Sequence, residues 1–151
     1  KGFSERNIRS MRLFYEENVE DEKWQQLVAK LPWGHNLLLI EKIKEGIQEK
    51  KGKNIIIADL TSIEDTICKY FVICQGNSPS QVNAIVDSVK EFARKGADSK
   101  PTAIDGLRNA EWVAMDYSDV LVHVFLPEVR SFYNLEHLWA DAKLTQIPDL
   151  D

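Results

Sequence analysis

The side chains with the most chemical potential stand in one stretch, "EWVAMDYSDVLVHVF", at residues 111–125. It holds two carboxylates, Asp116 and Asp119, and the imidazole of His123. Paired carboxylates can bind Mg²⁺ or act as acid and base, and histidine binds metals or transfers protons. The spacing argues against these roles, because the two aspartates are three positions apart across an expected turn and form no Asp-x-Asp pair.

Metal and nucleophile sites are not expected elsewhere either. His35, His123 and His137 fall in different predicted elements, and none has a second ligand at zinc-type spacing. Cys68 and Cys74 have no histidine nearby and fit buried free thiols that pack as small apolar groups. No Gly-x-x-x-x-Gly-Lys loop or Gly-x-Ser-x-Gly elbow occurs. We therefore predict no catalytic residue, no metal and no cofactor, and a protein that is not an enzyme.

One alternative is enzymatic. The segment "ICQGNS" runs from a predicted strand into a turn at a helix start, where backbone N–H groups can hold a phosphate. A residual nucleotidyltransferase-like enzyme could use this turn. Nucleotidyl transfer also needs closely placed carboxylates for Mg²⁺, and the following strands do not supply them.

Hydrophobic periodicity predicts the elements that position these residues. Helices are expected at about 36–50 and 78–96 and from Pro127 onward, and strands at 54–60, 70–76, about 102–104, 111–117 and 120–126. Ser78, Pro79 and Gln81 have the spacing of a capping box, and Gly96 is the expected helix end. This order predicts an α/β fold with a mixed β-sheet flanked by helices.

The last helix is expected to bury one face, made of Val129, Phe132, Leu135 and Trp139. The eight residues after it, "LTQIPDLD" at 144–151, predict no element.

The hairpin at 111–126 has two different faces, since side chains alternate along a strand. In the strand at 111–117, Trp112, Ala114 and Asp116 share one face, and Val113, Met115 and Tyr117 share the other. In the strand at 120–126, Leu121, His123 and Phe125 share one face, and Val120, Val122 and Val124 share the other. One face of the hairpin should pack on helices, and the other still mixes large apolar and polar groups. Aromatic and polar groups mixed in this way are typical of an interface anchor. The pattern leaves open whether this face is core and solvent or a partner surface, and on which of these His123 lies.

Charge and hydropathy narrow the class of partner. The 151 residues carry a net charge of −5, and residues 45–151 hold 11 basic against 17 acidic side chains. An acidic domain is a poor general nucleic-acid binder and suits a basic protein. No apolar run approaches the ~20 residues of a membrane span. We expect a cytoplasmic protein.

Three segments, "YFVICQGNS", "EWVAMDYSDVLVHVF" and "PEVRSFYNLEHLW", resemble in order and spacing the ribosomal silencing factor (RsfS, or Iojap-like) family over about residues 40–151. The resemblance implies a nucleotidyltransferase-like fold without the catalytic residues. It implies binding to the large ribosomal subunit through a basic protein on the joining face, the L-fourteen protein. That would block the small subunit and repress translation in starvation. It also implies a homodimer. Two departures are Ser118, where glycine is more usual, and Leu126, where histidine is common.

The resemblance also implies which residues touch the partner. Carried over by motif, they are Trp112, Asp116, Tyr117, Asp119 and His123, with Arg130 and Tyr133 on the following helix.

Residues 1–44 fall outside that pattern. "GFSERNIRSMRLFYE" and "QQLVAKLPWGHNLLLIEKIK" resemble the N-terminal helical domain of a bacterial family of PD-(D/E)xK-type nucleases. We therefore expect a helical N-terminal extension at 1–44, of fusion or chimera type, before a domain at 45–151. A nucleic-acid-binding module in residues 1–44 is a second alternative, although their charge of 8 basic against 7 acidic residues supports it weakly.

Overall fold

The computed structural model describes residues 32–64, 66, 68–135 and 142–150. The chain divides into two compact units, residues 1–38 and 39–151. In the first unit only residues 32–38 are described, as the start of helix α3 (Pro32–Glu49). The helices predicted before residue 32, and the side chains of His137 and Trp139, lie outside the described residues. The predicted boundary between residues 44 and 45 falls inside α3.

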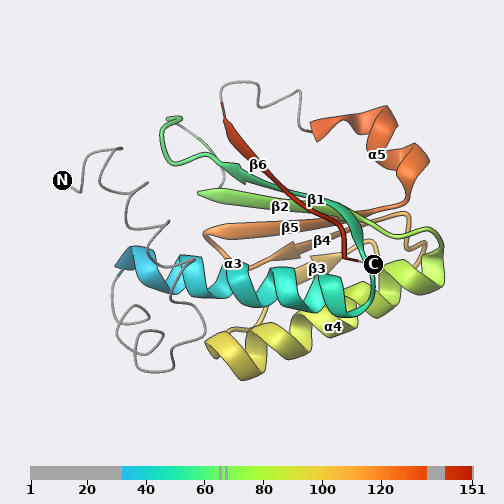
Figure 1. Ribbon diagram of the computed structural model, residues 1–151, viewed down its shortest axis with the longest axis horizontal. Coiled ribbons are helices and arrows are strands. Elements are labelled where there is room, and N and C mark those ends of the chain that lie inside the picture. Colours follow the sequence, from blue (N-terminus) through green and yellow to red (C-terminus); the bar gives the residue numbers. More distant parts are fainter. Residues whose placement is uncertain (1–31, 65, 67, 136–141, 151) are drawn as a thin grey trace. The chain divides into compact units, whose positions relative to one another are not determined.

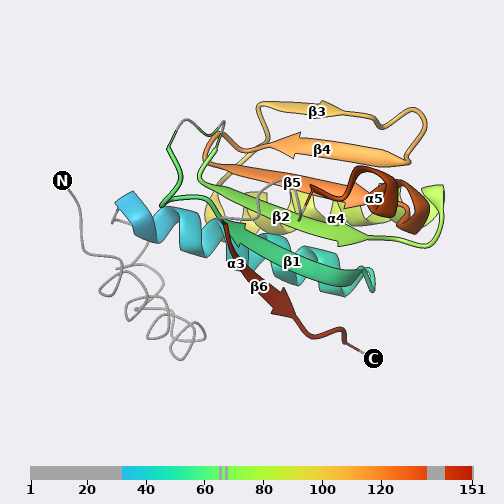
Figure 2. The ribbon, with the colours of Figure 1, turned by 90° about the horizontal axis from the view of Figure 1, so that it is seen from above.

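The second unit is built on a mixed sheet of six described strands, shown in Figures 1 and 2. The strands are β1 (Lys53–Asp59), β2 (Tyr70–Gln75), β3 (Ala103–Asp105), β4 (Trp112–Asp116), β5 (Val120–Phe125) and β6 (Lys143–Ile147). Their order across the sheet is β3-β4-β5-β2-β1-β6. The β2–β5 pair is parallel and the other four pairs are antiparallel. The predicted mixed sheet with flanking helices is confirmed.

Helices cover both faces of this sheet. Helix α4 (Pro79–Ala97) and residues 39–49 of α3 lie on one face, and the short helix α5 (Pro127–Tyr133) lies on the other (Figures 1 and 2). The α4 side holds a fully buried aliphatic core that includes Ile43, Ile47, Val82, Ile85, Val89, Val122 and Val124. Burying side chains of this size stabilises the fold by roughly 1.5–3 kcal/mol each. The rigid layer that results supports the hairpin β4–β5 from behind.

The start of α4 matches its sequence signature. Ser78 Oγ accepts a hydrogen bond from Gln81 N at 3.1 Å, and Gln81 Oε1 accepts one from Asn77 N at 2.7 Å. These two amides are among the donors that a phosphate at this turn would need, so the turn is poorly suited to the enzymatic alternative. The helix passes through Gly96 and ends after Ala97, where Asp98 has a φ of 48°.

The helices and strands differ from the sequence-based expectation at several points. Helix α3 begins at Pro32 rather than near residue 36. Helix α5 ends at Tyr133, because Asn134 takes a left-handed conformation with a φ of 50°. Phe132 is 80% exposed instead of buried on that helix. The tail at 143–147, for which no element was predicted, forms β6 along β1.

Cys68 and Cys74 are both free and buried, as expected. Burial raises the pKa of the Cys68 thiol to about 11 and that of Cys74 to about 12. Because the thiolate is the reactive form, we expect neither to act as a nucleophile near neutral pH.

This leads to a direct test. At pH 8, a chromogenic disulfide reagent should label both thiols of the denatured protein quickly and neither thiol of the folded protein on the same timescale. Single variants Cys68→Ser and Cys74→Ser would assign any signal. Rapid labelling of a native thiol would contradict the burial.

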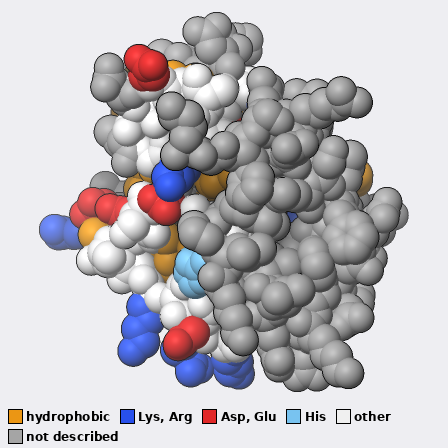
Figure 3. All heavy atoms as spheres, turned by 90° about the vertical axis from the view of Figure 1, so that its left-hand side faces the viewer, with side chains coloured by type: hydrophobic (Ala, Val, Ile, Leu, Met, Phe, Trp, Pro, Cys, Tyr) orange, Lys and Arg blue, Asp and Glu red, His pale blue; other side chains and the backbone are white. Residues whose placement is uncertain are grey.

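On the face shown in Figure 3, the basic and acidic side chains outside the grey region are mixed, and neither charge forms a continuous patch.

No helix among the described residues is both long and apolar enough to cross a membrane.

Candidate partner-docking face

The α5 side of the β4–β5 hairpin carries the candidate site. Its register places Trp112 opposite Phe125, Ala114 opposite His123, and Asp116 opposite Leu121. Val113 and Met115 are fully buried on the opposite side. The two-faced hairpin predicted from alternation is therefore confirmed.

Trp112 is the centre of an aromatic group. Its ring stacks on Phe125 with centroids 5.1 Å apart, and the ring of Tyr133 on α5 lies 4.7 Å away. Its indole Nε1 donates a hydrogen bond to His123 Nδ1 at 3.0 Å. Trp112 stays partly exposed. It thus presents a ring fixed by contacts from strand β5 and helix α5.

His123 is a core residue, which answers the question that the pattern left open. Its side chain is 4% exposed and meets Phe71 edge-on with centroids 4.9 Å apart. With so little accessible surface, His123 is poorly placed for direct contact with a partner, and its predicted contact role stays a prediction. Since Nδ1 accepts the indole hydrogen, the ring hydrogen sits on Nε2 and the imidazole is neutral.

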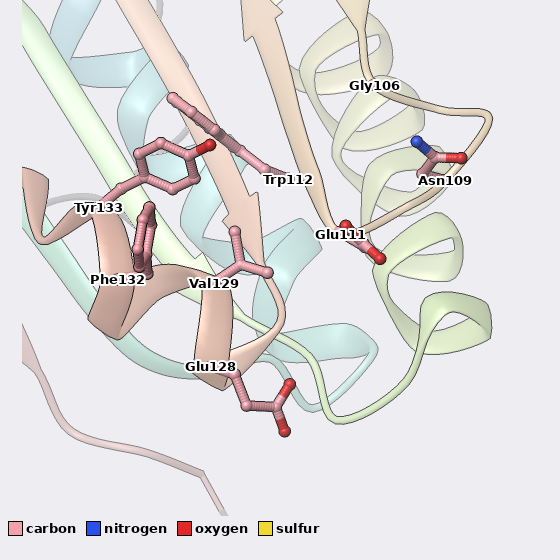
Figure 4. A pocket seen from close by; sticks show the side chains of 8 residues that line it. All are labelled: Gly106, Asn109, Glu111, Trp112, Glu128, Val129, Phe132 and Tyr133. Atoms are coloured by element: carbon pink, nitrogen blue, oxygen red, sulfur yellow. The ribbon is translucent and has the colours of Figure 1, made fainter.

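Beside Trp112 lies a hollow of about 400 Å³ (Figure 4). It is lined by Gly106, Asn109, Glu111, Trp112, Glu128, Val129, Phe132 and Tyr133. The rings of Phe132 and Tyr133 stand beside it on α5, and the carboxylates of Glu111 and Glu128 lie at the same hollow. Tyr133 is 46% exposed. We call these eight residues the docking face.

Glu111 and Glu128 make no ion pair with any described residue. Sequence reasoning missed both of them. The available signal was a glutamate directly after Pro127, in the exposed first turn of a helix beside the aromatic strand. Among the described residues, no group of three or more His, Cys, Asp or Glu side chains is placed to hold a metal ion.

Arg130 holds α5 onto the sheet and does not point to the docking face. It is 8% exposed, and its Nη1 donates to the carbonyl of Asn54 at 2.7 Å and to Gln75 Oε1 at 3.3 Å. The contact role expected for Arg130 stays a prediction, and the described contacts of this side chain are with the sheet. Its buried guanidinium instead fixes the helix that carries Phe132 and Tyr133.

Tyr117 is also not part of the docking face. It continues the helix side of β4 beyond Val113 and Met115, is 7% exposed, and burial raises its pKa to about 12. Asp116 and Asp119 belong to the turn at the far end of the hairpin, roughly 13 Å along the strand from Trp112. Asp119 Oδ2 lies 3.8 Å from Lys69 Nζ in an exposed ion pair. Of the seven predicted contact residues, only Trp112 and Tyr133 line the hollow, and His123 lies behind them in contact with Trp112.

A family model described as "Ribosomal silencing factor during starvation" matches residues 35–151. This chain belongs to that family. Curated relatives named ribosomal silencing factor RsfS occur in Halalkalibacterium halodurans and Bacillus subtilis. The first is 35% identical over 113 residues, covering 74% of this chain and 94% of the relative. The second is 41% identical over 100 residues, covering 66% and 82%.

A mouse relative named "Mitochondrial assembly of ribosomal large subunit protein 1" is 36% identical over 114 residues, covering 72% of this chain and 50% of the relative. A crystal structure of a Chromobacterium violaceum protein has a TM-score of 0.63 at 33% identity and covers 68% of this chain and 83% of that one. The expected family and fold are confirmed. A second model, the DUF1016 N-terminal domain, matches residues 1–51, so the two matches overlap at 35–51 within and just beyond α3.

The hairpin turn explains one departure from the family pattern. Ser118 has a φ of 72°, a region that favours glycine, in a two-residue turn closed by a hydrogen bond from Tyr117 N to Val120 O at 2.9 Å. Asp116 Oδ1 accepts from Ser118 N at 2.8 Å and supports this strained residue.

Replacing Ser118 with glycine should stabilise the protein by about 0.5–1 kcal/mol, because relief of left-handed strain exceeds the extra chain entropy of glycine. The expected rise in melting temperature is about 2–5 °C. Ser118→Ala is the matched control and should bring no gain. An equal rise in both variants would contradict the strain argument.

Proposed function

We propose that this protein binds the large ribosomal subunit through the docking face and keeps the small subunit from joining, which represses translation. Membership of the ribosomal silencing factor family supports this proposal. The mouse relative is named for large-subunit assembly, which points to the same subunit. The proposed partner places the protein with cytoplasmic ribosomes.

The observation that carries the proposal is a fixed aromatic surface exposed to solvent. Phe132 and Tyr133 project from α5, and Trp112 lies beside them around the hollow. Exposed rings of this kind are uncommon unless they bind something, and aromatic side chains dominate the energy of protein interfaces. Their rigid support means that little side-chain entropy is lost on binding.

Charge supports a basic protein as the direct contact on the subunit. The hollow holds two carboxylates, Glu111 and Glu128, without ion pairs among the described residues. A lysine or arginine of the partner could contact a carboxylate and an aromatic ring there at the same time. We therefore propose a basic ribosomal protein on the joining face, of the L-fourteen type, as the contact.

The mechanism needs only occupation of space. An interface of about 800 Å² per partner suffices for a stable complex and would cover most of one end of this small domain. A bound domain on the joining face then overlaps the position of the small subunit. No bond is made or broken.

Sedimentation of purified subunits tests the proposal. Small and large subunits are mixed with and without the protein, and joined ribosomes are measured on a sucrose gradient. We expect fewer joined ribosomes, with the protein in the large-subunit fraction. Phe132→Ala is the control, because it removes an exposed ring of the docking face without disturbing the core. This folded variant should reduce the number of joined ribosomes less than the unchanged protein does. Association at the unchanged level, or the protein in the small-subunit fraction, would contradict the proposal.

Reversing one charge in the hollow tests the electrostatic part. Glu128→Lys should weaken large-subunit binding about tenfold at low salt, because a repulsive contact replaces an attractive one. The loss should shrink above about 0.15 M salt as screening increases. Glu128→Gln, the matched neutral control, should lose less. A loss that is independent of salt would show that Glu128 acts through packing.

A further inference from the structure

His123 is an unusual residue for its position. It lies in the middle of β5, with Ala114 beside it on β4 and Ile73 beside it on β2. Its neighbours along the strand, Val122 and Val124, are fully buried. A polar ring in such a place is unfavourable unless its polar atoms are used. An aliphatic side chain would fill this position at lower cost, so the imidazole calls for a reason of its own.

The hydrogen bond to Trp112 supplies that reason. Trp112 and His123 are diagonal neighbours on adjacent strands, within reach of long side chains. Ala114, directly opposite His123, has only a methyl group and leaves room for the two rings to meet. Trp112 Nε1 and His123 Nδ1 are 3.0 Å apart.

The imidazole is itself fixed from two sides. It stacks on Phe125, with centroids 6.0 Å apart and planes 20° from parallel, and meets the edge of Phe71 on β2. An acceptor held this firmly defines the direction of the indole N–H. The ring contacts with Phe125 and Tyr133 place the indole, and the hydrogen bond to His123 adds a directional contact at its N–H.

We propose that His123 is a positioning residue of the docking face, whose neutral imidazole holds the Trp112 indole in the orientation that the partner meets. This inference rests on the proposed function, since the docking face is the surface that it orients. His123 contributes to binding without touching the partner. Its buried position separates it from the contact residues.

Two substitutions separate this role from simple packing. His123→Leu keeps an apolar volume and removes the acceptor. His123→Asn is smaller, but its amide oxygen can occupy the region of Nδ1 and accept from the indole. A purely structural role predicts that binding follows stability in both variants. A positioning role predicts opposite orders for stability and for binding. The His123→Leu variant should have the higher melting temperature, and the His123→Asn variant should bind large subunits more tightly.

We expect His123→Leu to weaken large-subunit binding about five- to tenfold, the size of one net hydrogen bond. Trp112→Phe, which removes the donor, should cause a similar loss, and the double variant should lose no more than either single one. His123→Asn should bind within about twofold of the unchanged protein. Additive losses, or unchanged binding in a folded His123→Leu variant, would overturn the proposal.

A measurement without ribosomes keeps the inference separate from the proposed function. In ¹⁵N spectra, the indole N–H signal of Trp112 is the one that disappears in Trp112→Phe. In His123→Leu this signal should shift and exchange faster with water, and in His123→Asn it should stay protected. An unchanged signal in His123→Leu would refute the hydrogen bond. A different outcome would refute the proposed function: the spectra change as expected, but the unchanged protein does not bind the large subunit. The hydrogen bond would then exist without a role in docking.

Discussion

Trp112→Ala should lower the affinity for the large subunit by about a hundredfold, because a central aromatic anchor contributes roughly 2–4 kcal/mol to an interface. The same change should also destabilise the domain by about 3 kcal/mol, at the low end for a lost tryptophan because the ring is partly exposed. It removes the stacking partner of Phe125 and Tyr133 and the donor to His123. The indole is therefore both an anchor and part of the fold.

The two effects are separated by comparison with Phe132→Ala. Phe132 is 80% exposed, so its removal should leave the melting temperature almost unchanged and still weaken binding, by about tenfold. Affinity is measured by co-sedimentation at a temperature well below the melting point of the Trp112→Ala variant. A folded Trp112→Ala variant that binds normally would remove Trp112 from the proposed interface.

Arg130→Met should produce the second large effect, a loss of about 2 kcal/mol in the free energy of unfolding. Methionine keeps the apolar part of the side chain and removes charge-assisted hydrogen bonds to Asn54 O and Gln75 Oε1. Asn54 O and Gln75 Oε1 belong to an exposed and a half-buried residue, so the expected cost is that of losing hydrogen bonds from a charged donor. Large-subunit binding should fall as well, because α5 carries Phe132 and Tyr133.

Arg108→Met is the matched control, because Arg108 is exposed and makes none of these bonds. Chemical denaturation gives the free energy of unfolding, and amide hydrogen exchange in α5 reports whether the helix has loosened. We expect faster exchange in residues 127–133 of Arg130→Met alone. Equal denaturation midpoints for the two variants would show that α5 does not depend on Arg130.

The parts of the fold that follow from local pattern were predictable. The β-branched run of β1 and the alternation in β4 and β5 reveal strands without any tertiary information. Ser78 and Gln81 predict the start of α4, because the hydrogen bonds of a capping box form within four residues. Alternation also placed Tyr117 on the same face of β4 as Val113 and Met115, and its burial agrees with that placement.

What could not be predicted depends on partners distant in the chain. Arg130 bonds to Asn54, 76 positions away, and nothing near either residue signals that pair. Phe132 is exposed because α5 ends early, at Asn134. The left-handed conformation of Asn134 was not anticipated from the sequence. The role of His123 needed the register of β4 against β5, which sets its distance from Trp112.

Strand β6 joins β1 only when residues 143–147 have been synthesised. In a chain without these residues, β1 would still have β2 on one side, and the other side of "KNIIIAD" would display open N–H and C=O groups. Such an edge recruits strands from other molecules. A translation product that stops before Lys143 should therefore aggregate more readily than the longer chain. A protein proposed to restrain ribosomes therefore depends on continued translation, through residues 143–147, to cover the open edge of its own β1.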